Sequence, residues 1–90
     1  FVRNPDSLVV EELARGRIEL QQVEVGKNSS AVGNTLRELK CPEGIRIAMI
    51  TRRGKTFVPN ADTVIEEADL TTIFGEPRKL RDFAKDLQNK

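Results

Sequence analysis

The stretch from Gly44 to Gly75 limits the fold more than any other part of the chain, because three strand-like segments follow one another there. An apolar run at Ile45–Ile50 leads into the charged turn Arg52–Lys55, whose glycine accepts a positive φ angle. The chain returns through residues 56–58, and a β-branched and aromatic run follows at Leu70–Phe74. This order predicts a hairpin and a third strand, which together form the sheet on which the rest of the chain packs.

The first of these strands is apolar on both faces, apart from one arginine. Because successive side chains of a strand point to opposite faces, one face carries Ile45, Ile47 and Met49, and the other carries Arg46, Ala48 and Ile50. A strand of this kind is typical of the interior of a sheet. The cations of the following turn are interpreted as a solvated hairpin tip, with contact to an anion as the alternative: Arg52, Arg53 and Lys55.

Another strand is predicted upstream, from Ile18 to Val25, but its apolar residues do not alternate in one phase. Ile18 and Leu20 share one parity, whereas Val23 and Val25 share the other, so a regular strand places the two pairs on opposite faces. A β-bulge near Gln21-Gln22 would bring both pairs onto a common inward face. The alternative is a strand whose two halves face different partners, one of them across an interface.

Three helices are predicted. The first begins after Asn4-Pro5, with Asp6 or Ser7 as the N-cap, and ends at Gly16. The second spans about residues 34–40 and ends before Pro42, which disfavours helix at the residue preceding it. The third spans about residues 77–88 and has apolar residues at helical spacing, namely Leu80, Phe83, Ala84 and Leu87.

The residue types present argue against catalysis. The chain has no histidine, which removes the commonest general base and the commonest metal ligand. Cys41 is the only cysteine, so it forms no internal disulfide, fits a reducing cytosol and has no imidazole to activate it. The acidic cluster matches no calcium loop and is interpreted as a solvated turn: Asp62, Glu66, Glu67 and Asp69. We predict no enzyme activity, no catalytic residue and no metal site.

Size and charge narrow the choice of partner. Ninety residues predict one domain with a modest core, which a partner surface would help to cover. A net charge of +1 gives no electrostatic reason to expect a nucleic acid partner, and four Phe without Trp or Tyr offer no stacking surface for bases. No apolar run approaches the roughly 20 residues that span a bilayer. The first residue is Phe1 rather than Met, which suggests a piece of a longer polypeptide.

Five motifs follow one another along the chain. They are Val32-Gly33-Asn34-Thr35-Leu36-x-x-Leu39, Pro42-Glu43-Gly44, Arg53-Gly54, Pro59-Asn60-x-Asp62-Thr63-Val64-Ile65-Glu66-x-x-Asp69 and Phe74-Gly75-x-Pro77. Their order and spacing resemble the RCK C-terminal domain family, also called TrkA-C, over roughly residues 18–87. Two positions depart from the family pattern. Ala68 stands where a glycine is common, and Asn34 replaces a common lysine, so a phosphate role of that lysine cannot be transferred.

The resemblance implies a regulatory lobe of a potassium channel, potassium-uptake system or cation/proton antiporter. Such lobes are homodimers that follow a Rossmann-like nucleotide-binding lobe, and they work in the cytoplasm beside a membrane-embedded transport subunit. Some relatives bind cyclic di-AMP in a cleft between two copies. By position, that cleft would involve Leu36 and Pro59 against adenine and Lys40 and Arg46 against phosphate.

Together these observations predict an α+β fold with a mixed or antiparallel sheet of three to four strands and two flanking helices. Residues 1–16 are expected to lead in from a preceding domain, and residues 17–90 to form the TrkA-C-like regulatory domain. The expected function is non-catalytic regulation of cation transport through dimerisation and binding of cyclic di-AMP or another nucleotide effector. A purely structural homodimerisation module without a ligand is the alternative.

Overall fold

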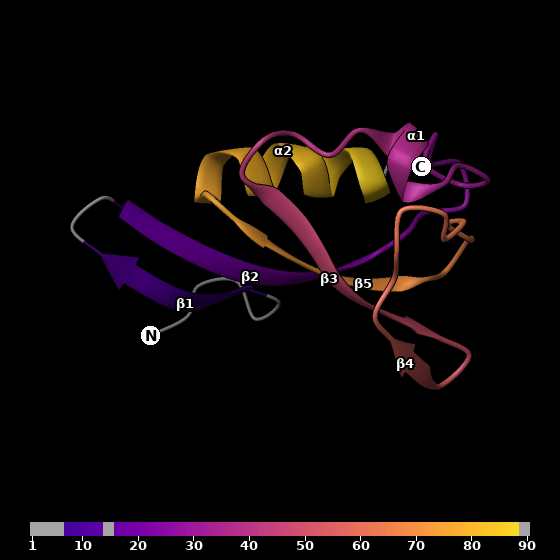
Figure 1. Ribbon diagram of the computed structural model, residues 1–90, viewed down its shortest axis with the longest axis horizontal. Coiled ribbons are helices and arrows are strands. Elements are labelled where there is room, and N and C mark those ends of the chain that lie inside the picture. Colours follow the sequence, from indigo (N-terminus) through magenta and orange to yellow (C-terminus); the bar gives the residue numbers. More distant parts are fainter. Residues whose placement is uncertain (1–6, 14–15, 89–90) are drawn as a thin grey trace.

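A single antiparallel sheet organises the protein, whose computed structural model describes residues 7–13 and 16–88. In chain order the elements are β1 (Ser7–Leu13), β2 (Gly16–Glu24), α1 (Leu36–Leu39), β3 (Ile45–Arg52), β4 (Lys55–Phe57), β5 (Leu70–Gly75) and α2 (Pro77–Gln88). The strands lie in the order β1-β2-β5-β3-β4, so the last strand in the sequence occupies the centre. Both helices lie on one side of this sheet (Figure 1). The predicted α+β class and the positions of both flanking helices are confirmed.

The hairpin of β3 and β4 forms as predicted. Ile50 pairs with Phe57 and Arg52 with Lys55, which leaves a two-residue turn between the strands. Arg53 and Gly54 in that turn have φ angles of 50° and 80°. Positive φ at both central residues gives the backbone twist that matches the flanking strands. Because β3 also pairs with β5, it lies inside the sheet, as its two apolar faces indicated.

The helix predicted to start at Asp6 or Ser7 and end at Gly16 is wrong. Ser7–Leu13 is the strand β1, which pairs antiparallel with β2 from Ser7 opposite Gln21 to Leu13 opposite Gly16. This strand raises the sheet to five strands, one more than expected. The free edge of β2 explains the difference, since its unpaired backbone groups bond to any extended segment close by. The start of the predicted helix, residues 1–6, lies outside the described residues.

The bulge predicted near Gln21-Gln22 is also wrong. The pairing of β2 with β5 runs without a break from Glu19 opposite Gly75 to Glu24 opposite Leu70. A regular strand therefore places its two apolar pairs on opposite faces, which was the alternative interpretation. Irregularities of the pairing lie instead in β1, between Val9 and Glu11, and in β3, between Ile47 and Met49. The bulge in β3 returns the end of that strand to the helix-covered face, where Ile50 is fully buried.

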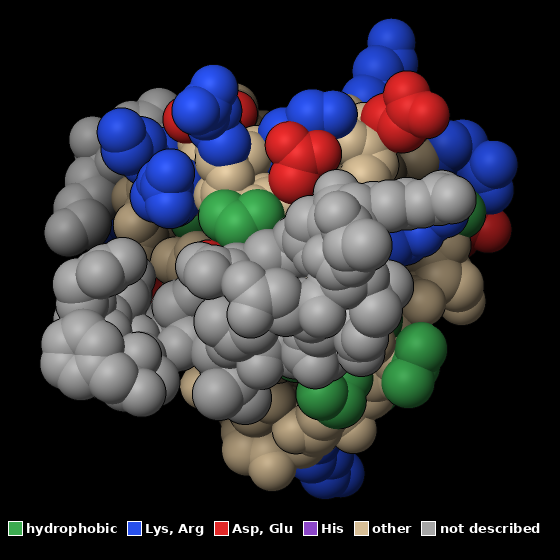
Figure 2. All heavy atoms as spheres, turned by 90° about the vertical axis from the view of Figure 1, so that its left-hand side faces the viewer, with side chains coloured by type: hydrophobic (Ala, Val, Ile, Leu, Met, Phe, Trp, Pro, Cys, Tyr) green, Lys and Arg blue, Asp and Glu red, His purple; other side chains and the backbone are tan. Residues whose placement is uncertain are grey.

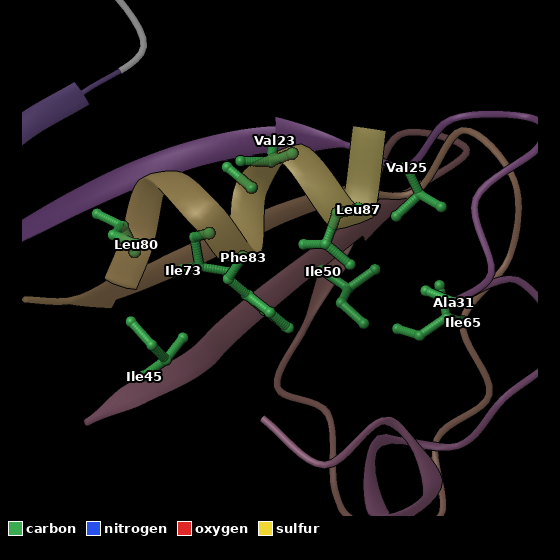
Figure 3. Close-up of a cluster of buried hydrophobic side chains, with 11 residues drawn as sticks. Val23, Val25, Ala31, Ile45, Ile50, Ile65, Ile73, Leu80, Phe83 and Leu87 are labelled. Atoms are coloured by element: carbon green, nitrogen blue, oxygen red, sulfur yellow. The ribbon is translucent and has the colours of Figure 1, made fainter. Parts of the chain in front are cut away.

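The core lies between α2 and the sheet (Figure 3). All four residues of the predicted helical stripe are buried, which confirms it: Leu80, Phe83, Ala84 and Leu87. They pack against buried residues of three strands, namely Val23 of β2, Ile45 and Ile50 of β3, and Ile73 of β5. Burial of a Leu or Phe side chain contributes about 1.5–3 kcal/mol to stability. One helix thus supplies much of the apolar surface that holds the sheet together.

Candidate functional site

The segment leading into α1 is tied to the loop that precedes β5. The Leu36 amide donates to the Thr63 carbonyl oxygen at 3.1 Å, and the Arg37 amide donates to that of Ala61 at 3.0 Å. Thr35 and Val64 form an isolated antiparallel bridge. These bonds hold two segments together that lie more than 20 residues apart in the sequence.

A capping box fixes the start of the short helix α1. The Thr35 hydroxyl accepts from the Glu38 amide at 3.1 Å, and the Glu38 carboxylate accepts from the Thr35 amide at 2.9 Å. Each bond satisfies an amide that the first turn of a helix leaves free. Leu36, the first residue of α1, is half-buried against the core. The cap therefore sets the position of the first predicted ligand-binding residue.

The four predicted ligand-binding residues do not meet in one cavity of a single chain. Leu36 and the half-buried Pro59 belong to the joined segments around α1. Lys40 follows α1 with a φ of 54° and lines a cavity of about 180 Å³ with, among others, Ser30, Leu39, Pro42 and Asp86. Neither Leu36 nor Pro59 lines that cavity.

Arg46 lies apart from the other three residues. It pairs with Phe74 across the sheet, and its neighbour Ile45 is buried beneath α2, so the exposed Arg46 belongs to the opposite face. Pro59 lies two residues after Phe57, which pairs with Ile50, and Ile50 lies four residues after Arg46 on β3. Because of the bulge in β3, the two positions lie opposite Phe74 and Thr71, three residues apart on β5, which is about 10 Å at 3.3 Å per residue. Nothing in the described chain tests ligand binding by these residues, which stays a prediction.

A buried ion pair joins the β3–β4 hairpin to the loop before β5. Arg52 donates from Nε and Nη2 to both carboxylate oxygens of Asp69, at 2.8 and 2.7 Å. The Asp69 side chain is 1% exposed, and it also accepts from the Glu66 amide at 2.9 Å. The hydrogen bonding of Arg52 to the Asp69 carboxylate raises the pKa of Arg52 above its ordinary value. Two parallel bonds to a planar guanidinium give this contact a fixed geometry.

Arg52 has further partners in the same region. It donates to the Val64 carbonyl oxygen at 2.8 Å and lies 5.3 Å from the centre of the Phe57 ring. Glu66 contacts both Arg52 and Arg53, at 3.1 and 3.2 Å. One guanidinium therefore connects β4, the end of the bridged loop and the start of β5.

This network corrects two interpretations of the sequence. Arg52 does not belong to a solvated hairpin tip, and Asp69 does not belong to a solvated acidic turn. The signal lay in the strand register: because Thr51 pairs with Leu70, the residues next to them, Arg52 and Asp69, become neighbours. Within residues 7–13 and 16–88, no group of three or more Cys, Asp or Glu is placed to hold a metal ion.

Cys41 is half-buried and packs beside the core. Burial raises the pKa of its thiol above the ordinary value, because the apolar surroundings disfavour the charged thiolate. The thiolate is the nucleophilic form of cysteine. A thiol held in its neutral form is consistent with a packing role for Cys41.

Ala68 offers a test of the local backbone. Its φ of 71° lies in the left-handed region, where a β-carbon costs roughly 1 kcal/mol. We therefore expect Ala68→Gly to stabilise the protein by a few tenths to about 1 kcal/mol, after the greater freedom of glycine in the unfolded chain is subtracted. Urea unfolding followed by circular dichroism measures this gain. Ala61→Gly in the neighbouring loop, which has no positive φ, is the control and is expected to be neutral or destabilising.

No helix among the described residues is long and apolar enough to cross a membrane. The sequence profile of the TrkA-C domain matches residues 20–88. Among solved structures, one described as an RCK domain with "cda" superimposes with a TM-score of 0.70 and 19% identity. That match covers 77% of this chain and 97% of the other. It supports the same fold.

Relatives from several organisms are potassium transport proteins. The Trk system potassium uptake protein TrkA of Streptomyces coelicolor is 37% identical over 54 residues, which cover 60% of this chain and 24% of that protein. A TrkA homologue of Archaeoglobus fulgidus is 30% identical over 77% of this chain and 16% of the relative. The K⁺/H⁺ antiporter subunit KhtT of Bacillus subtilis is 28% identical over 97% of this chain and 55% of the relative. The chain thus spans between 16% and 55% of these proteins.

Proposed function

The chain belongs to the TrkA-C domain family, and we propose that it is the non-catalytic regulatory domain of a potassium or other cation transport protein. In this proposal the domain forms a homodimer and binds cyclic di-AMP or a related nucleotide. It works in the cytoplasm at the inner face of the membrane, with a Rossmann-like lobe before it and a membrane-embedded transport subunit as its partner. The potassium uptake and antiporter proteins among its relatives support this assignment.

One observation gives the main support for the proposed ligand site: backbone hydrogen bonds join the segments that bear Leu36 and Pro59. These segments also expose apolar side chains, since Val58 is 78% and Val64 is 44% exposed. A hydrophobic surface backed by bonded main chain suits the flat face of an adenine base. Leu36 and Pro59 would form the firm part of that surface, because both are half-buried.

The phosphates of the effector would meet Lys40 and Arg46. Both side chains are exposed, but they belong to different sides of one chain, as the pairing of Arg46 with Phe74 indicates. A site that uses both cations therefore needs a second copy of the chain. Binding would then favour one arrangement of the two copies, and the transport subunit would respond only to that preference.

Calorimetric titration with cyclic di-AMP, and separately with ATP, tests this function. We expect saturable binding of one nucleotide, and about tenfold weaker binding for Lys40→Ala and for Arg46→Ala, because each loses a charge-assisted bond to phosphate. Lys55→Ala is the control, since this exposed cation lies at the hairpin end of β4. If neither nucleotide gives heat or a thermal shift, nucleotide binding is rejected and the alternative function, a structural homodimer without a ligand, is favoured.

A further inference from the structure

One edge of the segment at residues 63–65 is bonded to the chain that leads into α1. The carbonyl oxygens of Thr63 and Ile65 accept from the amides of Leu36 and Gly33, at 3.1 and 2.9 Å respectively. Successive carbonyl groups of an extended chain point to opposite edges. The carbonyl group between these two therefore points away from the chain before α1 and needs a different partner.

Arg52 provides that partner. Its Nη2 donates to the Val64 carbonyl oxygen at 2.8 Å, and the Asp69 carboxylate that fixes the guanidinium also accepts from the Glu66 amide at 2.9 Å. Ile65, which lies between the two held residues, is fully buried in the core. Because neighbouring side chains of an extended chain point to opposite sides, Val64 faces outward, where it is 44% exposed. Both the position and the orientation of this segment therefore depend on Arg52.

All three nitrogens of the Arg52 guanidinium are engaged within the chain. Nε and Nη2 bond to Asp69, Nη2 also bonds to the Val64 carbonyl oxygen, and Nη1 lies 3.1 Å from the Glu66 carboxylate. The central carbon of the group lies over the Phe57 ring, and the side chain is 19% exposed. These contacts occupy the groups that would bind a phosphate, so Arg52 acts on a bound effector through the loop that it holds.

We propose that Arg52 is a positioning residue of the candidate nucleotide site. It fixes residues 63–65, and through their bonds to the chain before α1 it fixes the apolar surface that faces the base. This inference rests on the proposed function and deepens it, because a wall that is already in place binds at a smaller entropy cost than one that orders on binding. Arg52 ends β3 and Asp69 directly precedes β5, so the same contacts connect the site to the centre of the sheet.

Arg52→Lys tests this role by calorimetric titration with cyclic di-AMP and with ATP. Lysine keeps the positive charge, but a single ammonium group cannot reproduce the planar fork that reaches both Asp69 and the Val64 carbonyl oxygen. We expect at least about tenfold weaker binding for this variant. The salt dependence of its dissociation constant is expected to equal that of the unchanged chain, because no contact with phosphate is lost. Lys40→Ala, which removes such a contact in the proposed function, is expected to reduce that dependence.

Amide hydrogen exchange reports on the loop itself. The Gly33 and Leu36 amides are expected to exchange at least about tenfold faster in Arg52→Lys, and saturating nucleotide is expected to slow them again, since binding and the hold on the loop favour each other. Arg53→Lys is the matched control, because it makes the same substitution at the neighbouring position, which is 76% exposed. Ala84→Gly is a second control, because it weakens α2 rather than the loop. Neither control is expected to change the dissociation constant.

A double variant serves if circular dichroism shows that Arg52→Lys does not fold. Arg52→Met with Asp69→Asn removes both charges of the pair, while the asparagine keeps an acceptor for the Glu66 amide. It lacks the bond to Val64 and is expected to lose at least about tenfold in affinity as well. Unchanged affinity in a folded Arg52 variant rejects the positioning role but keeps the nucleotide site. An unchanged chain that binds neither nucleotide rejects the site and this role together.

Discussion

Gly75→Ala is expected to destabilise the protein by about 3 kcal/mol or more, enough to unfold a domain of this size in part at 37 °C. A β-carbon built at Gly75 would overlap the carbonyl oxygen of Gly44 and the side chain of Ile45, and would lie 3.2 Å from the Ile45 Cα. Two of these contacts are with backbone atoms, which cannot move aside as a side chain can. The φ of 157° adds strain for any residue with a β-carbon.

Gly33→Ala is the matched control. Gly33 also has a positive φ, 88°, but a β-carbon there has no heavy atom within 4 Å. It is expected to cost only about 1 kcal/mol, the backbone term alone. Urea unfolding of both variants separates the two contributions. Equal losses would mean that the close approach of β5 to the start of β3 does not limit the residue at position 75.

Asp69→Asn is expected to cost about 2–4 kcal/mol, the second large effect. The substitution keeps the shape of the side chain, but it removes the charge opposite Arg52 and replaces one acceptor oxygen with a donor. Arg52 keeps its contacts with Glu66 and the Val64 carbonyl oxygen, but it loses its bonds to a fully buried carboxylate. A largely buried pair that loses one partner is costly, because the remaining charge is only partly compensated. The loss corresponds to a fall in melting temperature of about 10 °C or more for a domain of this size.

The exposed pair of Arg37 and Asp62 provides the comparison. Its two atoms lie 2.9 Å apart, but the side chains are 66% and 81% exposed. Asp62→Asn is therefore expected to change stability by less than about 1 kcal/mol. Thermal unfolding of both variants at the same ionic strength gives the contrast. A loss below 1 kcal/mol for Asp69→Asn would show that solvent screens the buried pair as well.

Local sequence patterns predicted the elements whose own residues specify their conformation. The hairpin around Arg53-Gly54 needed only turn chemistry, and α2 needed only the spacing of its four apolar residues. β1 was mistaken for a helix because Leu8, Val9 and Leu13 suit one face of a short helix as well as an extended strand. Pairing with the edge of β2 favours the extended conformation over the helix, and no local sequence pattern shows that this edge is available.

The irregularities of the sheet and the candidate site lay beyond sequence reasoning for a related reason. The bulge at Ile47/Met49 depends on how β3 and β5 fit over α2, not on the sequence of β3 alone. The bond between Arg52 and Asp69 follows from the register of the same two strands. For the site, the resemblance supplied Leu36, Lys40, Arg46 and Pro59, but only the structure separates Arg46 from the others.

The central place of β5 sets an order for folding. β2 and β3 both pair with β5 and not with each other, so the two halves of the sheet stay unjoined until residues 70–75 take their place. During synthesis these residues leave the ribosome after the other four described strands of this sheet. Assembly of this sheet therefore depends on contacts between residues distant in sequence, which slows folding relative to a protein with mainly local contacts. A nascent chain that ends before Leu70 contains the β1–β2 and β3–β4 hairpins without the strand that joins them.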